Sequence, residues 1–180
     1  MDALETLNRE VRLEELALQA IERELVLIRR TGRPDLVRLH QLLDFARNFE
    51  DRAHRQKEED HLFLHLKEHG NPASRTQLDD MARELEEEAR LIRVLAEAAV
   101  EFKLGDPSTV DPIRDALRDY HDRMRNRVRK ENSYLLPLMR RALSDEEKRR
   151  LDEEFQAVDR QNGGPGAVEK YEKILKQAAG

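Results

Sequence analysis

Apolar residues recur at alternating spacings of three and four along the first 30 residues, which is the pattern of one buried face of an α-helix. Similar stripes follow along most of the chain, separated by residues that interrupt helices. These breaks are Gly32-Arg33-Pro34, Gly70-Asn71-Pro72, Gly105-Asp106-Pro107 and Gly163-Gly164-Pro165. The pattern predicts helices near residues 3–30, 35–69, 75–103, 112–142, 145–160 and 166–178.

Short connections between four long helices favour antiparallel neighbours. We therefore expect an all-α, up-down-up-down four-helix bundle over residues 1–143. One or two additional helices would form a C-terminal extension over residues 144–180, packed on the bundle. A single extended coiled coil is disfavoured by the Gly-Pro breaks. Helix starts are indicated by capping boxes at Ser74 with Gln77 and Ser144 with Glu147, and by Asp111 ahead of Pro112.

The predicted bundle contains an internal repeat. The first and third helices share one apolar pattern, displaced by 74 residues, and each has a glutamate at the same rank, Glu14 and Glu88. The second and fourth helices repeat with a displacement of 73 residues, so that the His54-Arg-Gln-Lys-Glu58 segment corresponds to Arg127-Val-Arg-Lys-Glu131. These polar residues interrupt apolar stripes, and we expect them to meet in the core.

Composition narrows the chemistry of such a core. The 180 residues are 39% charged with only 7 Gly and 6 Pro, a balance typical of long solvated helices. A net charge of −5 makes nucleic acid a poor partner, and the lack of a long apolar run predicts a cytoplasmic protein without a membrane segment. Because there is no Cys, any metal would need His and carboxylate ligands.

Inward glutamates from two helices, with a glutamate and a nitrogen ligand from each of the other two, are the layout of di-metal carboxylate sites. The chain also resembles the hemerythrin-like proteins, or HHE cation-binding domains, over about residues 8–142. The resemblance is carried by residues 44–64, with His54 and Glu58, and by residues 120–137, with Arg127 and Glu131. It implies two irons held by a His on helix one, His-x-x-x-Glu on helix two, a His on helix three and His-x-x-x-Glu on helix four.

Only part of that implied ligand set is present. His54, Glu58 and Glu131 match it, whereas Val11, Leu85 and Arg127 stand where histidines are expected. A shift of one residue would place Glu86 instead of Leu85. Val and Leu have no lone pair to donate, and Arg keeps its proton, so an ordinary oxygen-carrying di-iron centre is not expected.

Two interpretations remain open. The one we favour from sequence is a metal-free polar core of His54, Glu58, Arg127 and Glu131 in a structural, partner-binding or sensory protein that is not an enzyme and has no cofactor. In the alternative, a carboxylate-rich site holds non-haem iron or manganese and binds, senses or activates oxygen, with His54, Glu58, Glu131, Glu14 and Glu88 as ligands. Glu14 and Glu88 could instead lie at the edges of the apolar helix faces, with their carboxylates in water.

The remaining candidates are weaker. Apolar residues near the C-terminus, among them Phe155 and Tyr171, need to be buried against the bundle or against a second copy of the chain or another protein. His61, His65 and His69 form a row at spacing four that is expected to be a solvated face, and His121 is expected at the surface. No nucleophile has an obvious base, so no catalytic residue is predicted.

Overall fold

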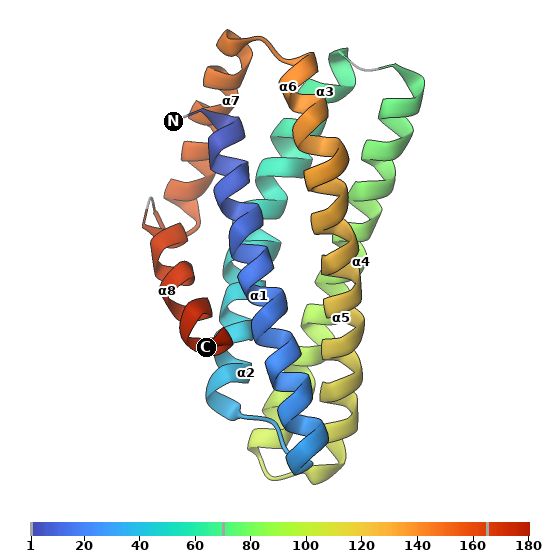
Figure 1. The fold of residues 1–180 in the computed structure, drawn as a ribbon, viewed down its shortest axis with the longest axis vertical. Helices are drawn as coiled ribbons and strands as arrows, with labels where there is room; N and C mark the ends of the chain where they lie inside the picture. The colour runs from blue at the N-terminus through green and yellow to red at the C-terminus, as the bar shows by residue number, and fades with distance from the viewer. Residues whose placement is uncertain (1, 70, 165) are drawn as a thin grey trace.

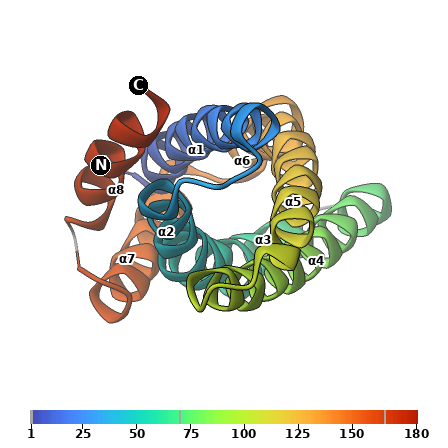
Figure 2. The ribbon, with the colours of Figure 1, turned by 90° about the horizontal axis from the view of Figure 1, so that it is seen from below.

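The computed structural model describes residues 2–69, 71–164 and 166–180; Gly70 and Pro165, expected within helix breaks, lie outside them. All regular structure in the described residues is helical, which confirms the predicted all-α bundle. Four antiparallel rods enclose one core, and two further helices lie outside the ring they form (Figure 1 and Figure 2).

The first rod is α1 (Ala3–Thr31) and the third is α4 (Pro72–Lys103). The second rod is continuous and contains α2 (Leu36–Phe45), η1 (Ala46–His54), η2 (Lys57–Leu62) and α3 (Phe63–His69). After a short turn, η3 (Pro107–Thr109), the fourth rod contains α5 (Val110–Lys130), η4 (Glu131–Leu135) and α6 (Leu136–Ala142). The outer helices are α7 (Asp145–Gln161) and α8 (Ala167–Ala179).

Local sequence explains most helix ends. Gly32 ends α1 with φ +69°, a left-handed conformation that glycine adopts without penalty, and its N–H donates to the Ile28 carbonyl. The Ser144 capping box is confirmed. The prediction of Ser74 as a cap is wrong, because Asn71 caps α4 and accepts the Ser74 N–H at 2.9 Å. The fourth rod also begins earlier than predicted, at Val110.

The apolar stripes of the four rods meet in the centre, as their period requires. Leu7, Leu62, Leu78 and Leu117, one from each rod, are at most 1% exposed. The core also extends outward on one side. There Tyr171 of α8 packs against Phe45 and Phe49, with ring centroids 5.6 and 5.4 Å away. The apolar tail residues are thus buried within the chain itself.

The helix α7 lies beside the second rod and α1, and its polar contacts include the histidine row (Figure 2). His61 and His65 contact Glu154 at 2.9 and 3.3 Å, and His69 contacts Glu147 at 2.8 Å. The three side chains remain 27%, 27% and 42% exposed, so the row is a partly solvated face that also contacts α7. The surface assignment of His121 is wrong, since its side chain is buried and its Nε2 lies 2.9 Å from Glu22.

Every helix in the described part of the chain is too short or too polar to span a membrane.

Candidate metal centre

Three stretches of π-helix lie in the second and fourth rods and carry most of their buried charged residues. In these turns a backbone N–H donates five residues back, as from Arg55 to Glu50, from Phe63 to Glu58 and from Leu136 to Glu131. The wider turn directs side chains differently from an α-helix, and such turns are frequent at functional sites. The buried charged residues in these stretches are Glu50, His54, Lys57, Glu58 and Glu131.

The Arg127 side chain lies wholly inside the bundle, with 0% exposure. Its guanidinium donates hydrogen bonds to one carboxylate from each of the four rods. Nη1 donates to Glu14 at 2.8 Å and to Glu131 at 2.6 Å, Nη2 donates to Glu50 at 2.6 Å, and Nε donates to Glu88 at 3.1 Å. The sequence predicts Arg127 beside Glu58 and Glu131. Arg127 donates a hydrogen bond to Glu131, whereas neither oxygen of Glu58 has a hydrogen-bond partner among the described residues.

His54 is the centre of a second set of contacts. Its Nδ1 lies 2.8 Å from an oxygen of Glu10. Its Nε2 faces oxygens of three glutamates, at 3.0 Å from Glu14, 3.7 Å from Glu58 and 3.9 Å from Glu131. One ligand atom each of Glu14, His54 and Glu131 lie within 4.8 Å of one another, close enough to share one cation.

Several oxygens around Nε2 have no hydrogen-bond partner among the described residues. Both oxygens of Glu58 lack a hydrogen bond, and so does Oε2 of Glu14 and of Glu131. Oε1 of Glu14 and Oε1 of Glu131 accept from Arg127. A buried carboxylate without a partner is costly. The unpaired oxygens therefore mark a place for positive charge beside Nε2 of His54.

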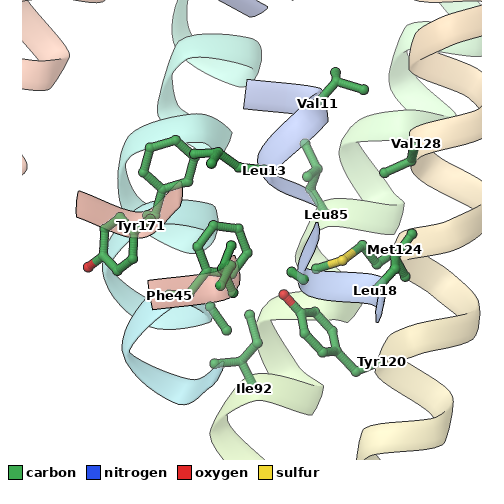
Figure 3. Close-up of a cluster of buried hydrophobic side chains, with 14 of the residues drawn as sticks. Val11, Leu13, Leu18, Phe45, Leu85, Ile92, Tyr120, Met124, Val128 and Tyr171 are labelled. Atoms are coloured by element: carbon green, nitrogen blue, oxygen red, sulfur yellow. The ribbon is translucent and has the colours of Figure 1, made fainter. Parts of the chain in front are cut away.

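Buried apolar side chains occupy the neighbouring positions on the same helices, and Figure 3 shows a cluster of them that includes Val11, Leu85 and Met124. Val11 and Leu85, which stand at positions where the family resemblance implied histidines, are buried in this apolar cluster and carry no donor atom. Water exclusion strengthens every charge interaction beside it. The apolar residues one turn before or after the buried glutamates and Arg127 include Val11, Leu18, Leu85, Ile92, Met124 and Val128.

The pKa values of the buried groups are shifted in different directions. Burial and the neighbouring Glu131 raise the pKa of Glu58 to about 8. Burial also opposes ionisation of Glu131, but the Arg127 guanidinium outweighs it and lowers the pKa of that carboxyl to about 2. Burial disfavours protonated His54, yet Glu14 and Glu58 raise its pKa well above its usual range. Without a bound cation, protons therefore supply the missing positive charge.

Behind His54, the buried charges continue toward α7. Glu10 uses one oxygen for Nδ1 of His54 and the other for the ammonium group of Lys57. Lys57 is 0% exposed, and its Nζ also contacts Asp159 of α7 at 2.5 Å. Burial opposes the ionisation of Glu10, but Lys57 and His54 lower the pKa of its carboxyl below the usual value.

These contacts show whether the residues could hold two metal ions or one. A pair of metals does not fit, because Arg127 binds four of the carboxylates and positions 11 and 85 have no donor. Room for a single cation remains at His54, whose Nε2 lies 3.4 Å from Nη1 of Arg127 and 3.7 Å from a Glu58 oxygen that has no hydrogen bond from a described residue. A carboxylate has room for both partners, since its two oxygens carry about four lone-pair sites.

The structure brings together all six residues singled out in the sequence, namely His54, Glu58, Arg127, Glu131, Glu14 and Glu88. Glu14 and Glu88 are 0% and 4% exposed, so the alternative in which they reach water is wrong. The shift that would bring in Glu86 is also wrong, because Glu86 is exposed and bonds Arg55 at 2.7 Å.

Sequence reasoning missed Glu10, Glu50, Lys57 and Asp159. Glu10 and Glu50 each lie four residues before a predicted member of the cluster, Glu14 and His54, and that spacing was an available signal. Lys57 and Asp159 had no comparable signal, because their contact joins segments about 100 residues apart in sequence.

A comparison with known protein families finds one match. The model of the hemerythrin HHE cation binding domain matches residues 3–139. No curated protein and no solved structure matches the chain. The matched span contains the first three rods, the fourth rod as far as Met139, and the residues that contact Arg127 and His54, whereas α7 and α8 lie beyond it.

Proposed function

Because the chain belongs to the hemerythrin HHE cation-binding family, we propose that it binds a single divalent cation, iron or manganese, beside His54. The ligands would be Nε2 of His54 and oxygens of Glu14, Glu58 and Glu131. The observation that carries the proposal is the pair of unpaired Glu58 oxygens, one of them 3.7 Å from Nε2. Imidazole and carboxylate together suit both metals.

Arg127 would stand where the family resemblance implies a second metal. Its guanidinium gives positive charge and N–H donors to Glu14, Glu50, Glu88 and Glu131, which supports the view that one half of the cluster needs no metal. Five buried carboxylates around one guanidinium and one imidazole still leave an excess of negative charge. That excess supports one cation rather than none.

A single cation changes the expected activity. Reversible oxygen carriage at a di-iron centre takes one electron from each iron. A guanidinium cannot replace an iron as an electron donor. Members of this family are generally oxygen or metal binders or sensors rather than enzymes. We therefore propose a cation-responsive structural or sensory protein, in which binding exchanges the protons of the cluster for a metal ion.

The rival proposal is a metal-free bundle whose core is held by ion pairs alone. It is favoured by the number of hydrogen bonds that Arg127 makes and by the raised pKa of Glu58, to about 8, because a protonated Glu58 needs no counter-charge. The two proposals differ in one measurable quantity, the number of cations bound per chain at neutral pH.

The test is a titration of the metal-stripped protein with Mn²⁺, with free Mn²⁺ followed by its electron paramagnetic resonance signal. We expect one ion per chain in the wild type and a loss of binding of at least tenfold in Glu58→Gln, because the amide keeps one weak ligand atom and loses the charge. Glu59→Gln is the matched control, since the neighbouring Glu59 is partly exposed and bonds Arg55 at 2.9 Å.

Three results would decide otherwise. Binding of no ion would favour the metal-free bundle. Two ions per chain, with oxo-bridged absorption bands after ferrous loading and exposure to air, would establish a di-metal centre despite Arg127. Equal loss in Glu58→Gln and Glu59→Gln would place the cation elsewhere.

The broader setting stays a prediction. It includes a second copy of the chain or another protein as partner, no nucleic-acid partner, a cytoplasmic location, and a division into residues 1–143 and 144–180.

A further inference from the structure

We infer that Lys57 and Asp159 are positioning residues for the cation site, so that α7, which lies beyond the family match, is a working part of that site. The inference rests on the proposed function and deepens it. Asp159 of α7 contacts Lys57, Lys57 contacts Glu10, and Glu10 contacts Nδ1 of His54. The chain of contacts runs without a gap from an outer helix to a proposed ligand.

The first step is the orientation of His54. A histidine that ligates a metal usually donates its other ring N–H to a carboxylate or carbonyl, which sets the tautomer and the ring angle. Ionised Glu10 can only accept hydrogen bonds, so Nδ1 must carry the proton at 2.8 Å from it. The lone pair of a neutral ring is then on Nε2, which faces Glu14, Glu58 and Glu131 and lies 3.4 Å from Nη1 of Arg127.

The second step is the orientation of Glu10. Its carboxylate is 0% exposed and has one oxygen for each of two partners, His54 and Lys57. Lys57 therefore balances the charge of Glu10 and prevents its rotation away from the imidazole. A buried ammonium is itself costly without a counter-charge. With only Glu10 as partner, it would compete with His54 for that single carboxylate.

The third step is Asp159, which supplies the second carboxylate. Its Oδ1 lies 2.5 Å from Nζ of Lys57, and the Asp159 side chain is 21% exposed, so it connects the buried chain with the protein surface. Phe155, one helical turn earlier on α7, covers Lys57 with its ring centroid 5.9 Å from Nζ. Together these residues give α7 a role at His54 that general packing of a helix would not require.

The experiment compares two aspartates on α7. Asp159→Asn removes the counter-charge of Lys57. Asp152→Asn is the matched control, because Asp152 also joins α7 to α1, through the Thr6 hydroxyl at 3.0 Å, and its other oxygen accepts from Gln156 at 2.8 Å. We expect the Mn²⁺ dissociation constant to rise about 10- to 100-fold in Asp159→Asn, the range for loss of outer-shell partners, and to change less than about twofold in Asp152→Asn. Asp159→Glu should recover most of the affinity.

A second readout needs no metal. Long-range ¹H–¹⁵N spectra of the metal-stripped protein should show a slowly exchanging proton on Nδ1 of His54 in the wild type and in Asp152→Asn. In Asp159→Asn that proton should exchange faster, because Glu10 no longer holds a fixed position. Circular dichroism of each variant checks that the helices are intact.

The outcomes separate the two proposals. If the wild type binds no Mn²⁺, the proposed function fails, and the exchange of the Nδ1 proton alone decides whether α7 positions His54. If Asp159→Asn binds Mn²⁺ like the wild type and keeps the slow proton, this inference is wrong while cation binding stands. If both variants lose affinity equally, α7 acts only through packing, and the inference is again wrong.

Discussion

A single side chain, Arg127, decides the chemistry that this core can perform. An arginine at a position where histidine is expected cannot ligate a metal. It can bind several carboxylates at once, because its donors point in fixed, diverging directions. The structure uses that property fully, with Nε, Nη1 and Nη2 all bonded to glutamates. At this position lysine would offer charge without the same geometry.

Replacing Arg127 should therefore be severe. Arg127→Ala leaves four buried glutamates without their shared partner, and we expect the metal-free protein to lose about 3–5 kcal/mol of unfolding free energy, the cost of breaking a buried ion pair. Urea denaturation followed by circular dichroism measures the change. Arg125→Ala, at an exposed arginine 3.3 Å from Asp122, should change stability by less than about 0.5 kcal/mol. An unchanged midpoint in Arg127→Ala would show that the network contributes nothing.

The residues of the cluster were predictable to different degrees. Glu14, Glu88 and Arg127 could be recognised because each interrupts an apolar stripe at helical spacing, which places a charge on a buried face. Glu50 gives no such signal, because its neighbour Phe49 is apolar and continues the buried face of the second helix. Lys57 sits in a charged stretch typical of a solvated surface, and nothing local shows that α7 covers it.

At the level of whole helices, the predicted boundaries agree with the structure to within about three residues, because glycine, proline and capping residues act locally. The π-helical stretches were not predicted. A π turn differs from an α turn by one residue, and no residue type marks it in the sequence. Its consequence is specific to this bundle, since His54, Glu58 and Glu131 all lie in such stretches.

Tyr171 is the buried aromatic residue of α8 and packs it against the second rod. Tyr171→Ala should cost about 3–5 kcal/mol, the range for removing a large buried ring, because the side chain packs on Phe45 and Phe49. Tyr171→Phe should cost less than about 1 kcal/mol, since the hydroxyl makes two long hydrogen bonds, donating to the Asp44 carbonyl at 3.5 Å and accepting from Nζ of Lys170 at 3.3 Å. Chemical denaturation of both variants tests this, and equal losses would mean that the hydroxyl, not the ring, holds α8.

For the whole molecule, the buried charges should make the stability of the metal-free protein depend on pH. Burial raises the pKa of Glu88 to about 7, although Arg127 opposes the rise. A carboxyl whose pKa is higher in the folded state stabilises the fold below its unfolded value of 4.5, and this stabilisation is lost as pH rises through 7. The upper limit is about 3 kcal/mol for this group.

Glu88→Gln should remove that contribution. Between pH 5 and pH 8 the unfolding free energy of the metal-free variant should fall less steeply than that of the wild type. Thermal or urea unfolding across this range provides the measurement, with Glu87→Gln as control because Glu87 is exposed and bonds the surface residue Arg123. Parallel curves for wild type and Glu88→Gln would show that Glu88 is ionised throughout.

The two repeated hairpins place an imidazole at position 54 and a guanidinium at the corresponding position 127. The guanidinium is attached covalently, so its charge stays in place under metal starvation, whereas the cation that we propose beside His54 would come and go with supply. Under that proposal the bundle would lose its ion and keep most of its shape. Emptiness and occupancy would then be two usable states of one folded protein.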